Sequence, residues 1–123
     1  MSVQAYQLYR QTQVSTASQG ELLLMLFDGA IRFARQSQEY MRQGELEQAS
    51  SKLIRTQDII SELILSLDLS VGEIAHNLQQ LYTYIYDLLV QANVRKTPEL
   101  VDDALHMLVE LRETWEQVVG QTK

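Results

Sequence analysis

The sequence has no cysteine, one proline and five glycines among its 123 residues. Without cysteine it can form neither a disulfide framework nor a thiolate site, which is typical of a cytosolic protein. No apolar run approaches the roughly eighteen residues that a membrane span requires. The opening stretch, MSVQAYQLYRQTQ, lacks the basic and apolar regions of a signal peptide. We therefore expect a cytoplasmic protein with no membrane-inserted segment.

Basic residues are also few. Ten Lys and Arg face sixteen Asp and Glu, the formal net charge is -6, and the basic residues are scattered along the chain. Nucleic-acid-binding proteins usually cluster Lys and Arg on one surface, so a nucleic-acid partner is not expected. The length and the 46% hydrophobic content are those of a single folded domain with its own core.

Apolar residues recur at spacings of three and four in four blocks, which predicts four helices and an all-α fold. Ser18 and Glu21 form an S-x-x-E capping box at the start of the first helix. Gly44 supplies a left-handed stop after it. The second helix is expected over about residues 45–67.

Local signals also delimit the last two helices. Ser70 and Glu73 form a second capping box, which predicts the start of the third helix. Thr97 and Pro98 match the N-cap and first helical residue of the fourth helix, and Gly120 is expected to end it.

Short connections between helices of about 20 residues make sequential helices antiparallel neighbours. Residues 18–123 are therefore predicted to form an up-down-up-down four-helix bundle, preceded by an N-terminal arm over residues 1–17. The arm carries Tyr6 and Tyr9. We expect it to dock on an apolar surface at least part of the time; the alternative is a short helix packed permanently on the bundle end.

Each predicted helix has more apolar residues than one core stripe needs. The expected stripe of the first helix comprises Leu22, Leu23, Leu26, Ala30, Phe33, Ser37, Tyr40 and Met41. The surplus positions that we select are Leu24, Phe27, Ile31, Ile54, Leu65, Tyr84 and Tyr86. Individually they could be wide-core positions, but a contiguous set of exposed apolar residues usually marks an interface for an amphipathic helix.

Two carboxylate-x-x-His pairs, Glu73 with His76 and Asp103 with His106, have the spacing of di-iron ligands. Both histidines are predicted to face away from the core, so no metal site or cofactor is expected. A histidine phosphotransfer domain is an alternative, although HNLQQ at His76 lacks the lysine and the small residue of that family's motif. No other catalytic motif is present, so an enzyme is not expected.

Five segments together resemble the FliS family of flagellar export chaperones: YQLYRQTQVSTASQGEL, LMLFDGAIRF, QDIISEL, EIAHNLQQLYTYIYDLLVQAN and LVELRETW. The resemblance runs from about Tyr6 to Trp115. It implies a cytoplasmic chaperone that binds the C-terminal segment of flagellin, prevents premature polymerisation and delivers flagellin to the export gate of the flagellar type III secretion apparatus. Tyr6 and Tyr9 match the two tyrosines of the family's arm, which covers part of the client groove.

Combining the two lines of argument, we interpret the seven surplus residues as the client groove and the tyrosines of the arm as its gate. An adaptor for a different secreted client shares every one of these physical arguments and stays open.

Overall fold

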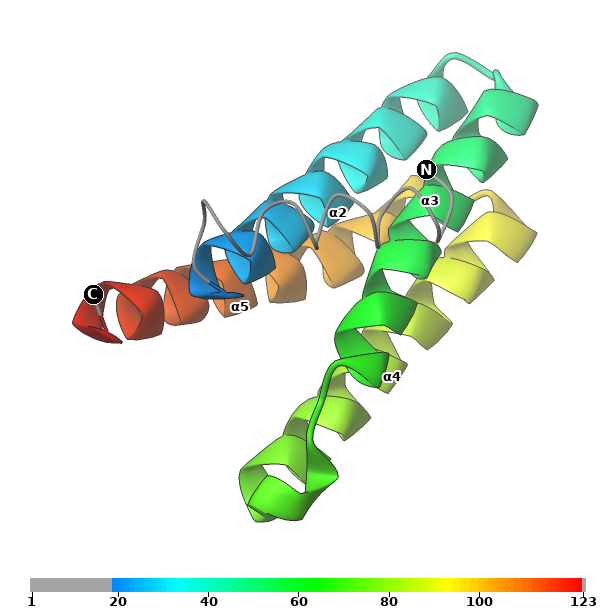
Figure 1. The fold of residues 1–123 in the computed structure, drawn as a ribbon. Helices are drawn as coiled ribbons and strands as arrows, with labels where there is room; N and C mark the ends of the chain where they lie inside the picture. Colours follow the sequence, from blue (N-terminus) through cyan, green and yellow to red (C-terminus); the bar gives the residue numbers. More distant parts are fainter. Residues whose placement is uncertain (1–18, 123) are drawn as a thin grey trace.

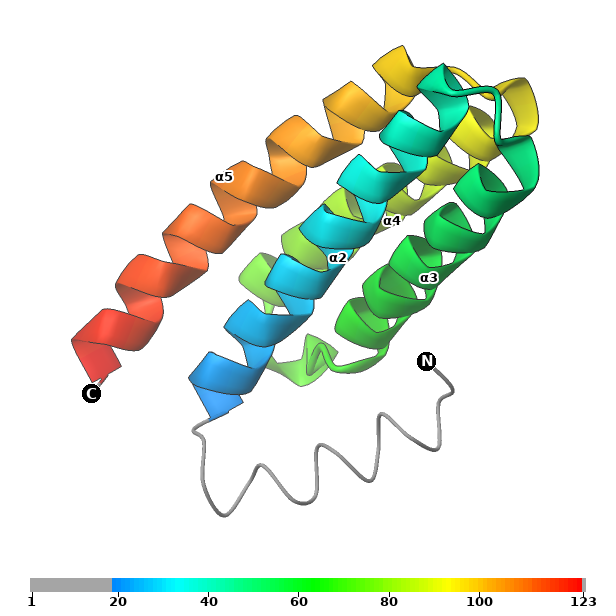
Figure 2. The same ribbon diagram turned by 90° about the horizontal axis from the view of Figure 1, so that it is seen from above.

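The structure, a computed structural model, describes the backbone of residues 19–122 and the side chains of residues 19–120. Its helices are α2 (Gln19–Arg42), α3 (Leu46–Leu65), the short 3-10 helix η1 (Leu69–Val71), α4 (Glu73–Arg95) and α5 (Pro98–Thr122). Each long helix packs against the next one in the chain, and α5 returns to α2 (Figure 1, Figure 2). The predicted antiparallel four-helix bundle is confirmed. The predicted arm and the Ser18 cap lie outside the described residues.

The end of α2 forms as its glycine predicts. Gly44 has a φ of 76°, a left-handed conformation that glycine adopts without steric cost. Its N–H donates to the Met41 carbonyl at 3.1 Å, and the Glu45 N–H donates to the Tyr40 carbonyl at 2.8 Å. This pair of bonds caps the last carbonyls of α2 and turns the chain toward α3.

The start of α4 differs from the prediction. The Ser70 hydroxyl and backbone N–H both donate to Asp68 Oδ1, at 2.5 and 3.0 Å, so this serine caps no helix. An aspartate two residues earlier can bond these groups in an Asx turn, which builds η1 instead of a capping box. The N-cap of α4 is Gly72.

The predicted start of α5 at Pro98 is confirmed, but Gly120 does not end this helix. A glycine costs an exposed helix only about 1 kcal/mol relative to alanine and does not by itself stop it.

The buried face of α2 is rotated relative to the predicted stripe. Phe27 is fully buried, Ile31 is only 7% exposed, and both belong to the main core cluster. The interpretation of these two side chains as surplus surface is therefore wrong. Leu23, Leu26 and Phe33, which the prediction placed in the stripe, are only partly buried.

Small residues explain this rotation. Ala30 and Ala34 are fully buried, and a Cβ added to the buried Gly29 would lie 3.3 Å from Ile59 Cδ1 of α3. Short side chains let two helix backbones approach closely, so they mark the contact face even though they bury little area. The predicted stripe included Ala30 but omitted Gly29 and Ala34.

Apolar side chains near the ends of the helices are less buried than their spacing indicates. Leu46, Ile74 and Val118 have the spacing of core residues but are exposed, and each lies within the first two or last five residues of its helix. Side chains at the end of a bundle have neighbours on one side only. Conversely, Ile59 and Leu105 lie within α3 and α5, away from the ends of these helices, and are buried.

Polar contacts tie α5 to α2 at two levels. Gln38 Nε2 of α2 donates to Asp102 Oδ1 at 2.6 Å and to the Pro98 carbonyl at 2.9 Å. Farther along α5, Arg112 Nε donates to Asp28 Oδ1 at 2.6 Å. These bonds hold α2 and α5 together along much of their length.

Two isoleucine-to-serine substitutions test the corrected core. Ile31→Ser puts a hydroxyl in the core and is expected to lower the free energy of unfolding by about 3 kcal/mol. Ile54→Ser, at a side chain that is 48% exposed, should lower it by less than about 1 kcal/mol. Urea unfolding followed by circular dichroism measures both. Equal losses would contradict the burial of Ile31.

Candidate functional site

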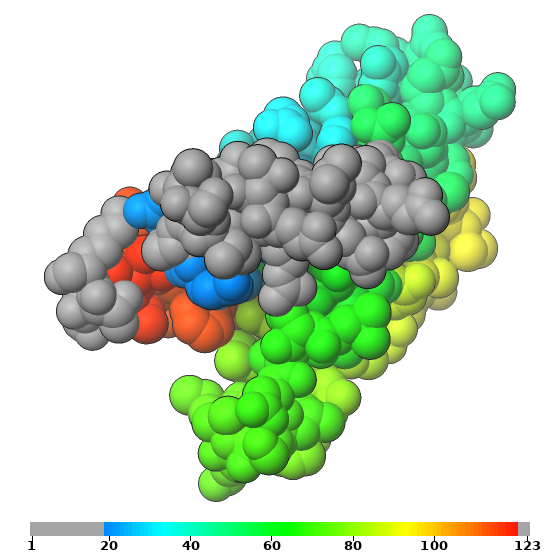
Figure 3. Space-filling model, viewed as in Figure 1, coloured from blue at the N-terminus to red at the C-terminus, as the bar shows by residue number. Residues whose placement is uncertain are grey.

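An apolar cleft opens where α4 and α5 diverge. These helices meet at the short connection between Arg95 and Pro98, but the start of α4 and the end of α5 lie far apart (Figure 1). In the space-filling view, the orange and red surface of α5 lies to the left, and the green surface around the start of α4 lies at the bottom (Figure 3). A cavity of about 190 Å³ lies here, lined by Leu81 of α4 and by Met107, Glu110, Leu111 and Thr114 of α5. We call these five residues the α4–α5 cleft.

A buried tyrosine joins the helices around this cleft. Tyr82 follows Leu81 on α4 and is only 1% exposed. Its hydroxyl accepts a hydrogen bond from Trp115 Nε1 of α5 at 3.3 Å. Its ring centroid lies 6.3 Å from that of Phe27 on α2, within the range of favourable aromatic pairs. One side chain thus connects α2, α4 and α5.

Burial also affects the acidity of this tyrosine. Removal of the hydroxyl from water raises the pKa of Tyr82, and the bond donated by Trp115 lowers that pKa in part. The phenol is therefore held in its neutral form to higher pH than a tyrosine in water.

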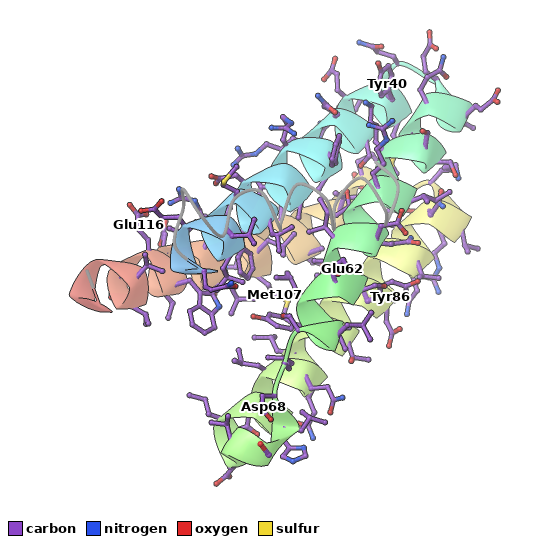
Figure 4. The ribbon with its side chains drawn as sticks, viewed as in Figure 1. Tyr40, Glu62, Asp68, Tyr86, Met107 and Glu116 are labelled. Atoms are coloured by element: carbon purple, nitrogen blue, oxygen red, sulfur yellow. The ribbon has the colours of Figure 1, made fainter. Side chains whose placement is uncertain are left out.

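Further apolar side chains extend the cleft along both helices. Leu78 lies about one turn and Ile74 about two turns before Leu81, so all three share one side of α4. Ile74 is 66% exposed. On α5, Val118 lies seven residues after Leu111 and is also exposed. Figure 4 shows Met107 in the opening between α5 and the α3/α4 pair. The resulting surface has the form of a groove for an amphipathic segment.

The five surplus residues that remain do not form a single groove. Ile54 and Leu65 are exposed and share one face of α3, because eleven residues make about three turns. Tyr84 is exposed and lines a second cavity of about 310 Å³ with Gln79, Gln80, Thr83 and Asp87. Tyr86 is half-buried on the opposite flank of α4, since two residues rotate a helix by about 200°. Leu24 on α2 is half-buried. Tyr6 and Tyr9 lie outside the described residues.

The sequence does not reveal the cleft, because Leu81, Leu111 and Trp115 have the spacing of core residues in their helices. They are partly buried and pack against the core from the side on which the helices diverge. The spacing of Met107, Leu111 and Val118 along one flank of α5 is the signal that could have indicated this surface.

The two histidines face outward as predicted. His76 is exposed, and His106 is exposed with its Nε2 3.3 Å from Glu110 Oε1. Within residues 19–122, no three His, Cys, Asp or Glu side chains gather as metal ligands. No helix of this part of the chain is both long and apolar enough to cross a bilayer.

Comparison with known proteins identifies the family. Residues 2–122 match the family model described as "Flagellar protein FliS". The chain belongs to the FliS family. It is 32% identical over 114 residues to the flagellar secretion chaperone FliS of Bacillus subtilis, covering 93% of this chain and 85% of that protein. It is 34% identical over 119 residues to FliS of Vibrio cholerae, covering 95% and 88% of the two chains. FliS of Campylobacter jejuni is 34% identical over 115 residues, with coverage of 93% and 90%.

Membership in the FliS family confirms the resemblance and makes the chain a flagellar secretion chaperone. FliS chaperones are non-enzymatic, so the prediction that the chain is not an enzyme is also confirmed. The family match includes all of α4 and the cleft residues of α5.

The raised pKa of Tyr82 gives a test of the junction at the cleft. As pH rises, the unfolded chain loses the tyrosine proton first, near pH 10, while the folded chain still holds it. The folded state then binds more protons, so Tyr82 makes stability fall above that pH until the folded pKa is passed. We expect Tyr82→Phe to make this alkaline decline shallower.

Urea unfolding at several pH values between about 8 and 11 measures the decline. The Tyr82→Phe variant also loses the hydrogen bond from Trp115. That loss changes its free energy of unfolding by the same amount at every pH at which the phenol of the unmodified chain is neutral, so it does not change the slope there. Tyr84→Phe, at an exposed tyrosine, is the matched control and should leave the slope unchanged. Identical slopes for the two variants would contradict the burial of the Tyr82 hydroxyl.

Proposed function

We propose that this FliS-family chain is a cytoplasmic chaperone that binds the C-terminal segment of flagellin. Binding prevents premature polymerisation, and the complex is delivered to the export gate of the flagellar type III secretion apparatus. Family membership supports the class of protein. The single observation that carries the proposal is the α4–α5 cleft, an apolar surface left open beside a well-packed core.

The chemistry of the cleft suits such a client. A segment that is amphipathic and unordered before assembly needs an apolar groove in which to fold. Leu81 and Leu111 offer aliphatic walls, and Met107 offers an unbranched side chain that adapts to different partner residues. A client burying about 2000 Å² would gain tens of kcal/mol of gross hydrophobic free energy, most of it offset by ordering the segment. Such a complex is tight and still releasable.

Further surfaces can hold the rest of a client that wraps around the bundle. Ile54 and Leu65 on α3, and Tyr84 and Tyr86 on α4, provide separate apolar contacts on the outside of the molecule. Leu24 adds a half-buried contact on α2. In this proposal the arm, through Tyr6 and Tyr9, covers part of this client surface when flagellin is absent.

Two matched glutamate substitutions test the cleft. Met107→Glu puts a charge in the cleft and should weaken binding of a flagellin C-terminal peptide by at least about tenfold, or about 1.4 kcal/mol. Val94→Glu, at an exposed valine outside the cleft, is the control and should bind as the unmodified chain does. Titration calorimetry measures the affinity, and circular dichroism measures the helicity that the peptide gains.

Thermal unfolding of both variants verifies that they remain folded. Equal affinity of the unmodified chain and Met107→Glu would place the client elsewhere. No binding to the unmodified chain would contradict the flagellin assignment and favour an adaptor for another secreted client.

Removal of residues 1–13 tests the gate. The shortened chain is expected to bind more of an apolar-surface dye, or to self-associate, because client surface is uncovered. Addition of the flagellin peptide should abolish the difference between the shortened and full chains. Unchanged dye binding and an unchanged sedimentation profile would mean that the arm covers no client surface.

A further inference from the structure

Three cations converge on one phenylalanine on the side of the bundle formed by α2 and α3. The guanidinium carbon of Arg32 lies 5.2 Å from the centroid of the Phe33 ring. Lys52 Nζ and the guanidinium carbon of Arg55 each lie 5.4 Å from the same centroid. These distances are within the range of cation–π contacts. We call these four residues the Phe33 cluster.

No carboxylate of the described residues forms an ion pair with Arg32, Lys52 or Arg55. The ion pairs in this part of the chain join Arg112 to Asp28 and Glu116, and His106 to Glu110. Asp28, one turn before Arg32, is thus engaged by α5. Three positive charges therefore stand together in a protein whose net charge is -6.

The proximity of these charges has an electrostatic cost. Since all three lie within 5.4 Å of one point, their separations cannot much exceed the Debye length of about 10 Å at 0.1 M salt. Their repulsion is therefore only partly screened, and an anion bound among them would relieve it. The basic residues that are scattered in the sequence are brought together here by the packing of α2 on α3.

We propose that the Phe33 cluster is a docking site for an acidic peptide segment of a partner protein. Arg32 and Arg55 are exposed, and their planar guanidinium groups match carboxylates with two parallel hydrogen bonds. The half-buried Phe33 ring keeps the cations close together and offers an apolar contact between them. Nucleic acid fits less well, because it requires a longer basic surface than three residues on an acidic protein provide.

This site does not involve the α4–α5 cleft, and the inference does not depend on the identity of the secreted client. The Phe33 cluster lies on α2 and α3, which form one side of the bundle. The helices of the cleft, α4 and α5, form the opposite side. A chaperone could therefore hold an apolar client in the cleft and an acidic partner at the Phe33 cluster at the same time.

Fluorescence anisotropy of the full chain with a short labelled peptide of alternating glutamate and serine tests the site. We expect salt-sensitive binding that falls by at least about tenfold in the double variant Arg32→Gln/Arg55→Gln. The matched control, Arg42→Gln/Arg95→Gln, removes the same charge from two other exposed arginines and should keep most of the affinity. The resonances of the Phe33 ring should shift when the peptide is added.

A further variant tests the role of the Phe33 ring, and two further probes test whether the site selects acidic peptides. Phe33→Leu keeps an apolar side chain but removes the ring, and should also weaken binding. Equal losses in the two double variants, or equal binding of a glutamine–serine peptide, would overturn the proposal. Tighter binding of a single-stranded oligonucleotide of equal charge would overturn it as well. Binding of the flagellin peptide should be unchanged in Arg32→Gln/Arg55→Gln, which separates this site from the proposed function.

Discussion

The architecture depends on how Tyr82 is buried between three helices. A phenol enclosed in a protein core needs a hydrogen-bond partner, and the Trp115 indole N–H supplies it across the gap between α4 and α5. The same ring packs beside Phe27 of α2. These contacts hold α4 to α5 and α2 at this level, and the stretch of α4 that precedes Tyr82 diverges from the end of α5. That divergence leaves Leu78 and Leu81 only partly covered.

The other sides of the bundle are closed by different means. Between α2 and α3, small residues around Gly29 allow close backbone approach. Between α2 and α5, Gln38 and Arg112 add polar bonds at two levels. A secretion chaperone benefits from this asymmetry, because the closed sides keep the scaffold folded while the apolar cleft stays formed before the client arrives. A preformed groove lowers the ordering cost that binding must overcome.

The sequence predicts the helices well, because their signals act over a few residues. Periodicity defines four blocks, and Gly44 and Pro98 act on their own neighbours in the chain. The orientation of α2 could not be derived this way, because apolar residues cover much of its circumference. The packing of α3 at Gly29 and of Tyr82 against Phe27 accompanies the inward orientation of Phe27 and Ile31.

The two surfaces for which we propose binding roles were harder still to predict, since both are products of packing. Leu81 and Met107 line a cleft only because two helices separate, and their spacing within each helix is compatible with an ordinary core. The Phe33 cluster joins residues that are about twenty positions apart on different helices. Its existence follows from the register of α2 on α3, which no local pattern specifies.

We propose that the α4–α5 cleft is the surface that receives the secreted client. The most direct measurement is NMR of the full chain, with labelled methyl groups and indole, before and after addition of the flagellin C-terminal segment. We expect the largest shifts at the methyl groups of Leu81, Met107 and Leu111 and at the Trp115 indole. Binding that leaves these four signals in place while moving others would contradict it.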